Sequence, residues 1–152
     1  MPTALAGVYQ LRQAKTRQRK QRGSETGPLI PHGSPGFVLA PELQPLPSEA
    51  VIDKITMSAF EGGPPLDIVL RDCGVRAYLI VGVALAVGIE PTARHSADLG
   101  YVPVIVRDAC GAGDRPAAQR TLDALAFAGD AMLADTEEVC ATLIQAPISP
   151  AE

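Results

Sequence analysis

The chain has 152 residues, of which 47% are apolar and 20% are charged. This composition is typical of one soluble globular domain, and no continuous apolar run is long enough for a membrane helix. Three cysteines and no recognisable export signal favour a cytoplasmic protein over a disulfide-stabilised secreted one. Three Phe, three Tyr and no Trp leave little aromatic surface for stacking on nucleic-acid bases.

Positive charge is concentrated near the N-terminus. The whole chain has a net charge of −4 and residues 1–22 contribute +6, so the remaining residues carry about −10. Such a basic segment could bind nucleic acid or an anionic surface, or form a solvated helix or an arm packed on a partner subunit. Nothing else in the chain supports nucleic-acid binding, which we do not expect. The basic residues are Arg12, Lys15, Arg17, Arg19, Lys20 and Arg22.

The first half of the chain contains few regular elements. Residues 5–21 could be helical, and the glycine- and proline-rich residues 23–47 predict an ordered surface loop. Residues 51–55 predict a short strand, and residues 65–72 predict a helix. The apolar residues on one face of that helix are Leu66, Val69 and Leu70.

The central third predicts a βαβ unit. Residues 77–83 are almost entirely apolar, which is typical of a strand buried on both faces. A helix over residues 88–99, with Glu90 and Pro91 in its first turn, leads to a second apolar strand over residues 102–106. This order implies a parallel sheet, and ligands then bind beyond the carboxyl ends of the strands, here at residues 83–88.

The C-terminal third continues the alternation of predicted helices and strands. Residues 115–127 predict a helix whose inward side chains are Leu122, Leu125 and Ala126. Residues 131–134 predict a strand, and residues 136–143 a helix with Thr136 as its N-cap. We therefore expect a basic segment at 1–22, an α/β domain at 23–144 and a flexible tail at 145–152.

Two motifs carry a family resemblance. Residues 82–101, GVALAVGIEPTARHSADLGY, resemble the signature of the isochorismatase-like cysteine hydrolases, roughly G-V-x-T-x-x-C-V-x-x-T-A-R-x-A-x-x-x-G-Y. Residues 51–60, VIDKITMSAF, are similar to the segment around that family's catalytic lysine, and the similarity extends over about residues 33–143. The matching residues are Lys54, Ser58, Ala59, Phe60, Gly82, Val83, Thr92, Ala93, Arg94, Ala97, Gly100 and Tyr101, together with the D-A-C sequence at 108–110.

The resemblance implies a three-layer αβα fold with a Rossmann-like parallel sheet whose first strands are missing. A sheet without those strands would expose an apolar edge. Either the polypeptide is a shortened form of a longer protein, or partner chains cover the gap. Because the family commonly forms homo-oligomers, we expect this chain to be a subunit of one.

The resemblance also assigns a site. It places the catalytic positions at Lys54 and Gly88 and substrate contacts at Ala84, Leu85 and Ile89. The family's nucleophilic cysteine falls on Gly88 and its threonine on Leu85, while its catalytic aspartate has no counterpart. Backbone N–H groups at the start of the helix could still hold the oxyanion of an attacked amide. A non-proline cis peptide is expected between Ala84 and Leu85.

Two functions follow from this pattern. One is a hydrolase-like domain for a small amide or ether, catalytically impaired because only the lysine of the family's three catalytic groups is present. The alternative is a non-catalytic family member, a pseudoenzyme that binds a small molecule or serves as an oligomer subunit. Family members that cleave a vinyl ether also carry glycine at position 88, but they need the missing aspartate. They also have an aromatic residue and a histidine where this chain has Ala84 and Ala86.

The remaining chemistry-bearing residues have ordinary explanations. Cys73, Cys110 and Cys140 form no CxxC pair and are expected to be structural thiols. Asp108 ends a strand beside the site, where the D-A-C segment is expected to be structural. The residues that could contact a ligand are Arg94, His95 and His32. We expect no metal and no cofactor, because the two histidines are far apart in the sequence and no phosphate-binding loop is present.

Overall fold

The computed structural model describes residues 35, 38–52, 54, 56–61 and 65–146. The chain divides into two compact units, Met1–Val51 and Ile52–Glu152. The described part of the first unit holds one short 3-10 helix, η3 (Pro41–Leu43), with exposed side chains. The predicted helix at 5–21, the basic segment, His32 and most of the tail lie outside the described residues.

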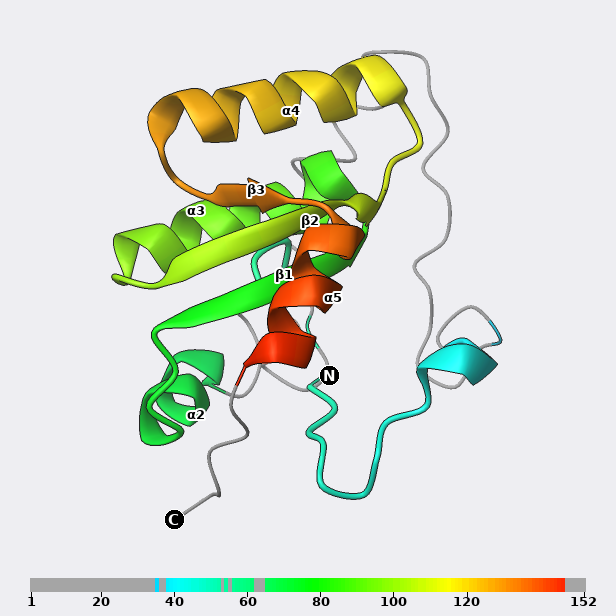
Figure 1. Cartoon of the computed structure of the whole chain (residues 1–152), viewed down its shortest axis with the longest axis vertical. Coiled ribbons are helices and arrows are strands. Elements are labelled where there is room, and N and C mark those ends of the chain that lie inside the picture. The colour runs from blue at the N-terminus through cyan, green and yellow to red at the C-terminus, as the bar shows by residue number, and fades with distance from the viewer. Residues whose placement is uncertain (1–34, 36–37, 53, 55, 62–64, 147–152) are drawn as a thin grey trace, which may run out of the picture. The chain divides into compact units, whose positions relative to one another are not determined.

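The second unit is built on a parallel sheet. Its strands are β1 (Ala77–Val83), β2 (Val102–Gly111) and β3 (Met132–Ala134), in the order β1-β2-β3 (Figure 1). The predicted parallel βαβ unit is therefore confirmed. The prediction that its first strand is buried on both faces is wrong, because Leu79, Val81 and Val83 leave one face of β1 exposed. The strand predicted at 51–55 is not seen in its described residues, 51, 52 and 54. The lysine side chain there binds carbonyls of the turn that follows, as described below.

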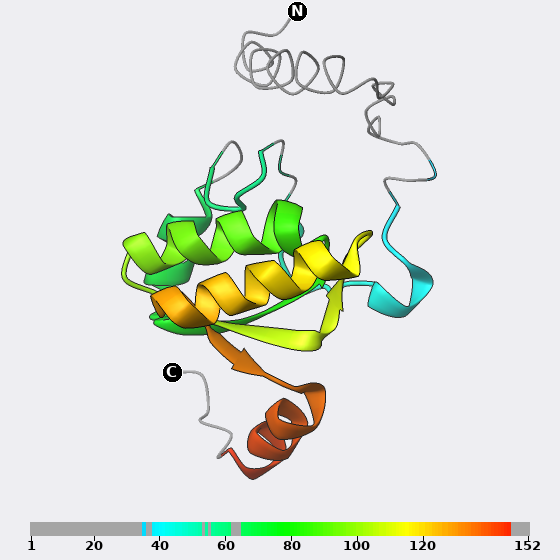
Figure 2. The same cartoon turned by 90° about the horizontal axis from the view of Figure 1, so that it is seen from above.

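Helices cover both faces of the sheet. α3 (Glu90–Asp98) joins β1 to β2, and α4 (Arg115–Ala128) joins β2 to β3. Both lie on one face, whereas α5 (Thr136–Gln145) lies on the other (Figure 2). This is the three-layer α/β arrangement expected from the sequence. Within the described residues, no helix has both the length and the apolar character needed to cross a membrane.

Several element boundaries differ from the predictions. Helical backbone begins earlier than residue 88, with a π-helical turn η4 (Leu85–Ile89) that runs directly into α3. β2 also extends beyond its predicted end, because after an irregularity Gly82 and Val83 pair with Cys110 and Gly111. The helix before β1, α2 (Leu66–Asp72), agrees closely with its prediction.

The N-cap of α5 is Asp135, not Thr136 as predicted. The Asp135 side chain and that of Glu138 form a reciprocal capping box at the start of the helix. Thr136 instead donates both its backbone N–H and its hydroxyl to Asp108 Oδ1, at 2.9 Å each. A carboxylate one residue earlier, with Glu three positions after it, makes the stronger cap.

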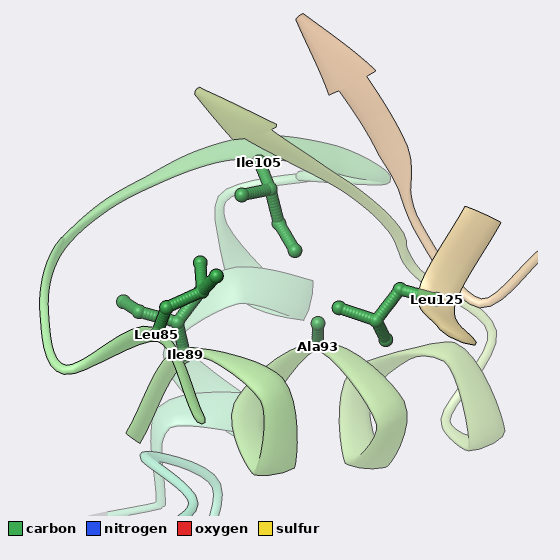
Figure 3. Close-up of a cluster of buried hydrophobic side chains, with 5 residues drawn as sticks. All are labelled: Leu85, Ile89, Ala93, Ile105 and Leu125. Carbon is green, nitrogen blue, oxygen red and sulfur yellow. The ribbon is translucent and has the colours of Figure 1, made fainter. Parts of the chain in front are cut away.

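The core lies between β2 and the two helices on its face. Leu85, Ile89 and Ala93 follow one another at intervals of four residues and point toward Ile105 and Leu125 (Figure 3). Leu122 packs against this cluster, but Ala126 is exposed, contrary to the prediction. The inner face of α4 instead continues through Ala118 and Thr121. The exposed Val69 likewise departs from the predicted apolar face of α2.

Candidate active site

The carboxyl end of β1 forms the base of the site. Gly82 has a φ of 122°, a backbone conformation that other residues rarely adopt. The Val83–Ala84 peptide is cis, one residue before the predicted position between Ala84 and Leu85. That prediction is wrong by one bond. Ala84, which follows the cis bond, is the extended N-cap of η4, and Leu85 is already helical.

Lys54 and Gly88 lie next to each other. A Cβ atom built on Gly88 would lie 3.9 Å from Lys54 Nζ and 3.9 Å from each of the carbonyl oxygens of Met57 and Val83. These are ordinary van der Waals distances, so position 88 has room for a side chain directed toward the ammonium group. The structure thus brings together the two residues that the sequence resemblance assigned to catalysis, across 34 positions of the chain.

The lysine is held by its own segment. Its Nζ donates to the carbonyl oxygens of Thr56 at 2.8 Å and Met57 at 3.0 Å. The Thr56 hydroxyl has the Ser58 carbonyl at 2.7 Å and the Glu61 carbonyl within reach, and its single proton can be donated to either. These bonds close the segment into a tight turn, which fixes the ammonium group beside Gly88.

The lysine segment is attached to α3 by two hydroxyl groups. The Ala59 N–H donates to Thr92 Oγ1 at 3.0 Å, and Thr92 Oγ1 donates to the Gly88 carbonyl at 2.7 Å. Ser58 Oγ lies 3.1 Å from His95 Nδ1. Ser58 and Thr92 are both buried, so these bonds are shielded from water.

An aromatic cluster packs beside this attachment. The Phe60 ring lies 5.9 Å from the His95 ring and 5.6 Å from the Tyr101 ring, measured between centroids. Tyr101 donates to Asp67 Oδ1 at 2.8 Å, and this bond, with a smaller contribution from Arg71, holds the pKa of Asp67 below its usual value. The cluster therefore connects the S-A-F motif to α2 and α3.

The backbone donors near Gly88 are engaged within the turn. The N–H groups of Val87, Gly88 and Ile89 all donate to the Ala84 carbonyl, at 3.0, 2.8 and 3.3 Å. A ligand oxyanion at residue 88 would compete with that carbonyl. Leu85 and Ile89, assigned to substrate contacts by resemblance, place their side chains in the core, and Ala84 supplies the carbonyl at the centre of the turn.

The other candidate ligand residues are paired elsewhere. Arg94 bonds the carboxylates of Glu90, at 3.1 Å, and of Asp130, which lies in the turn after α4. His95 contacts Ser58, and Asp108 accepts two hydrogen bonds from the start of α5. No group of three His, Cys, Asp or Glu side chains suited to a metal ion occurs among the residues that the structure describes.

The three cysteines lie on other elements. Cys110 is half-buried on β2, with its Sγ 3.8 Å from the Ile80 carbonyl, and burial raises the pKa of its thiol. Cys73 follows α2 and Cys140 lies in α5, both exposed. A thiol with a raised pKa is a weak nucleophile at neutral pH. The motif resemblance implies that Gly88 occupies the position of the family's cysteine.

Sequence reasoning missed the residues that join the two motifs. Thr92 and Ser58 were recognised as motif positions, yet no role was assigned to either. The sequence did contain one signal for such a role: the S-A-F and T-A-R motifs each begin with a hydroxyl residue. A parallel sheet could bring these two motifs close together. Which hydroxyl meets which backbone group depends on the tertiary arrangement.

Known proteins resemble this chain in sequence and in fold. The chain matches the isochorismatase domain family over residues 5–138. It is similar to an isochorismatase family protein from Desulfovibrio vulgaris, at 22% identity and TM-score 0.70, covering 95% of this chain and 92% of that one. It is also similar to an isochorismatase-like hydrolase from Alkaliphilus metalliredigens, at 19% identity and TM-score 0.70, covering 82% of this chain but only 65% of that one.

A further similarity is to a nicotinamidase from Staphylococcus aureus, at 26% identity and TM-score 0.50, covering 53% of this chain and 52% of that one. The family match begins nearer the N-terminus than the resemblance noted in the sequence, and it includes both motifs that meet at Lys54 and Gly88. Because the match spans most of the sequence, the chain belongs to the isochorismatase family.

Proposed function

We propose that the chain binds a small amide or ether at the site formed by Lys54 and Gly88, and that it is impaired in amide hydrolysis. The observation that carries the proposal is the 3.9 Å separation between Lys54 Nζ and the position that a side-chain carbon on residue 88 would take. The cation is in place, but residue 88 supplies no thiol to attack a carbonyl.

The groups around position 88 suit a small polar ligand. A ligand carbonyl or ether oxygen could take the place of one of the main-chain carbonyls that the Lys54 ammonium binds, while the Met57 and Val83 carbonyls could accept from an amide N–H. A nicotinamidase among the solved relatives supports the amide class. Without a nucleophile, these contacts would bind and orient a ligand but would not form an acyl-enzyme intermediate.

Binding and turnover can be measured separately. We would titrate the protein with a panel of small primary amides, N-carbamoyl compounds and ethers by calorimetry, and would measure ammonia release from the amides. We expect binding of at least one class with negligible turnover, lost in Lys54→Ala and retained in Arg120→Ala, a matched change on the exposed side of α4. No binding by any class, or substantial Lys54-dependent amide hydrolysis, would refute the proposal.

A second candidate function is that of a non-catalytic subunit in a homo-oligomer. The supporting observation is a row of exposed apolar side chains on β1, with exposed fractions of 44% for Leu79, 56% for Val81 and 81% for Val83. Light scattering after size exclusion would test it. We expect an oligomer that Val81→Lys weakens, and a monomer at micromolar concentration would contradict this candidate.

A further inference from the structure

We propose that Thr92 is a positioning residue that sets the distance between Lys54 and residue 88. The inference rests on the proposed Lys54–Gly88 site, although its test needs no substrate. The single hydroxyl of Thr92 contacts both sides of that site. It accepts a hydrogen bond from the Ala59 N–H at 3.0 Å and donates one to the Gly88 carbonyl at 2.7 Å.

The bond to Gly88 is by itself unremarkable, because a threonine in a helix often donates to the carbonyl four residues earlier. The bond from Ala59 is different, since it joins positions 33 residues apart and comes from the lysine segment. Thr92 is buried, so both partners are bonded in a region with little water. Removing the hydroxyl would leave an N–H and a carbonyl without this partner.

Ala59 belongs to the same short segment as the two carbonyls that bind the lysine. Lys54 Nζ is held by the carbonyls of Thr56 and Met57, and the same turn continues directly into Ala59. On the other side, the Gly88 carbonyl belongs to the residue whose side-chain position faces the ammonium. Thr92 therefore connects the segment that holds the cation to the residue that the cation faces, through one oxygen atom.

A second contact, between Ser58 and His95, offers an alternative explanation for how the lysine segment is positioned on α3. It also joins the lysine segment to α3, through Ser58 Oγ and His95 Nδ1 at 3.1 Å. However, the Ser58–His95 hydrogen bond joins those two side chains, whereas Thr92 bonds the Gly88 carbonyl directly. If the Ser58–His95 contact alone were sufficient, loss of the Thr92 hydroxyl would leave the site geometry unchanged, which is an outcome of the test.

A thiol introduced at position 88 can report this distance. In a background of Cys73→Ser, Cys110→Ala and Cys140→Ser, we would make Gly88→Cys and measure its alkylation rate by iodoacetamide as a function of pH. The resulting thiol pKa depends on the nearby ammonium and needs no enzymatic activity. The comparison variants are Thr92→Val, Thr92→Ser and Lys54→Ala, with Ser96→Ala as a control that removes another buried hydroxyl of α3.

We expect Lys54→Ala to raise the pKa of the introduced thiol and Thr92→Val to produce at least half of that rise. Thr92→Ser should restore the parent value, and Ser96→Ala should not change it. Thermal melts would establish that each variant is folded, and Thr92→Ala would replace Thr92→Val if the latter unfolds.

The two levels of the proposal fail in different ways. A thiol pKa that does not depend on Lys54 would refute the proposed site itself. A pKa that depends on Lys54 but not on Thr92→Val would refute only the positioning role. Equal shifts in Thr92→Val and Ser96→Ala would also refute it, because they would reflect a general loosening of α3.

Discussion

Gly88→Cys is the most informative single change in this protein. Gly88 lacks a positive φ, and a Cβ there meets its nearest neighbours at 3.9 Å, so the variant should fold. The new thiol would lie beside the Lys54 ammonium. We expect a thiolate favoured by this cation, with a pKa below that of an ordinary cysteine.

The expected fall in the thiol pKa follows from the distance between residue 88 and the Lys54 ammonium. At about 4 Å, two unit charges interact by ~1 kcal/mol in bulk water and ~4 kcal/mol at an effective dielectric constant of 20. Because Lys54 is exposed, we take a value of ~1–3 kcal/mol, between these limits. One pKa unit corresponds to ~1.4 kcal/mol, so the thiol pKa should fall by about 1–2 units from ~8.5.

The assay has a chemical and a catalytic part. The pH dependence of iodoacetamide alkylation gives the pKa, and ammonia release from primary amides gives the activity of the parent, Gly88→Cys, Lys54→Ala and the double variant. We expect the pKa shift but no restored hydrolysis, because the resemblance leaves the family's aspartate base without a counterpart. Catalytic groups that act as a unit contribute little when only some are present.

Two results would refute this reasoning. A pKa at or above the ordinary value in Gly88→Cys, with Lys54 present, would show that the ammonium does not act on position 88. Substantial amide turnover by Gly88→Cys alone would show that another group already serves as the base. In that case the chain would lack only its nucleophile.

Three further predictions concern stability and reactivity. Leu125→Ala removes a fully buried core side chain and should lower the free energy of unfolding, measured by urea denaturation, by about 2–5 kcal/mol. Phe127 is 95% exposed on the same helix, so Phe127→Ala should lower it by less than about 0.5 kcal/mol. Similar losses in the two variants would contradict the assigned core. The hydrogen bond from Arg107 lowers the pKa of Asp135, so this carboxylate stabilises the fold above its unfolded pKa and loses that contribution as the pH falls below ~3.9. Asp135→Asn should therefore reduce the loss of stability that the protein shows on acidification. An unchanged loss would argue against the Arg107–Asp135 ion pair. Iodoacetamide should label Cys110 more slowly than the two exposed cysteines, because burial raises its pKa, and a fast reaction blocked by substrate would instead identify it as a relocated nucleophile.

Much of the fold was predictable from the sequence because its signals are local. These signals are the apolar runs at β1 and β2 and the helix-starting residues Glu90 and Pro91, and each acts over one turn or one strand. The strand predicted at 51–55 is not seen at residues 51, 52 and 54, since a short apolar stretch does not show whether its backbone will find a partner strand. Here the lysine within it bonds the turn that follows.

The sequence by itself determined which residue stands at each motif position, including glycine at 88 and lysine at 54. It therefore determined that the proposed site has a cation but no thiol at residue 88. Only the tertiary structure decided how these residues meet. Residue spacing does not encode the distance between Lys54 and Gly88 or the two hydrogen bonds of the Thr92 hydroxyl, since both depend on segments far apart in the sequence. Nor does it encode the orientation of the Ala84 carbonyl, which accepts three N–H groups. The physical reason is that a hydrogen bond depends on distances and angles set by packing of the whole domain, whereas a sequence motif records only residue types along one dimension.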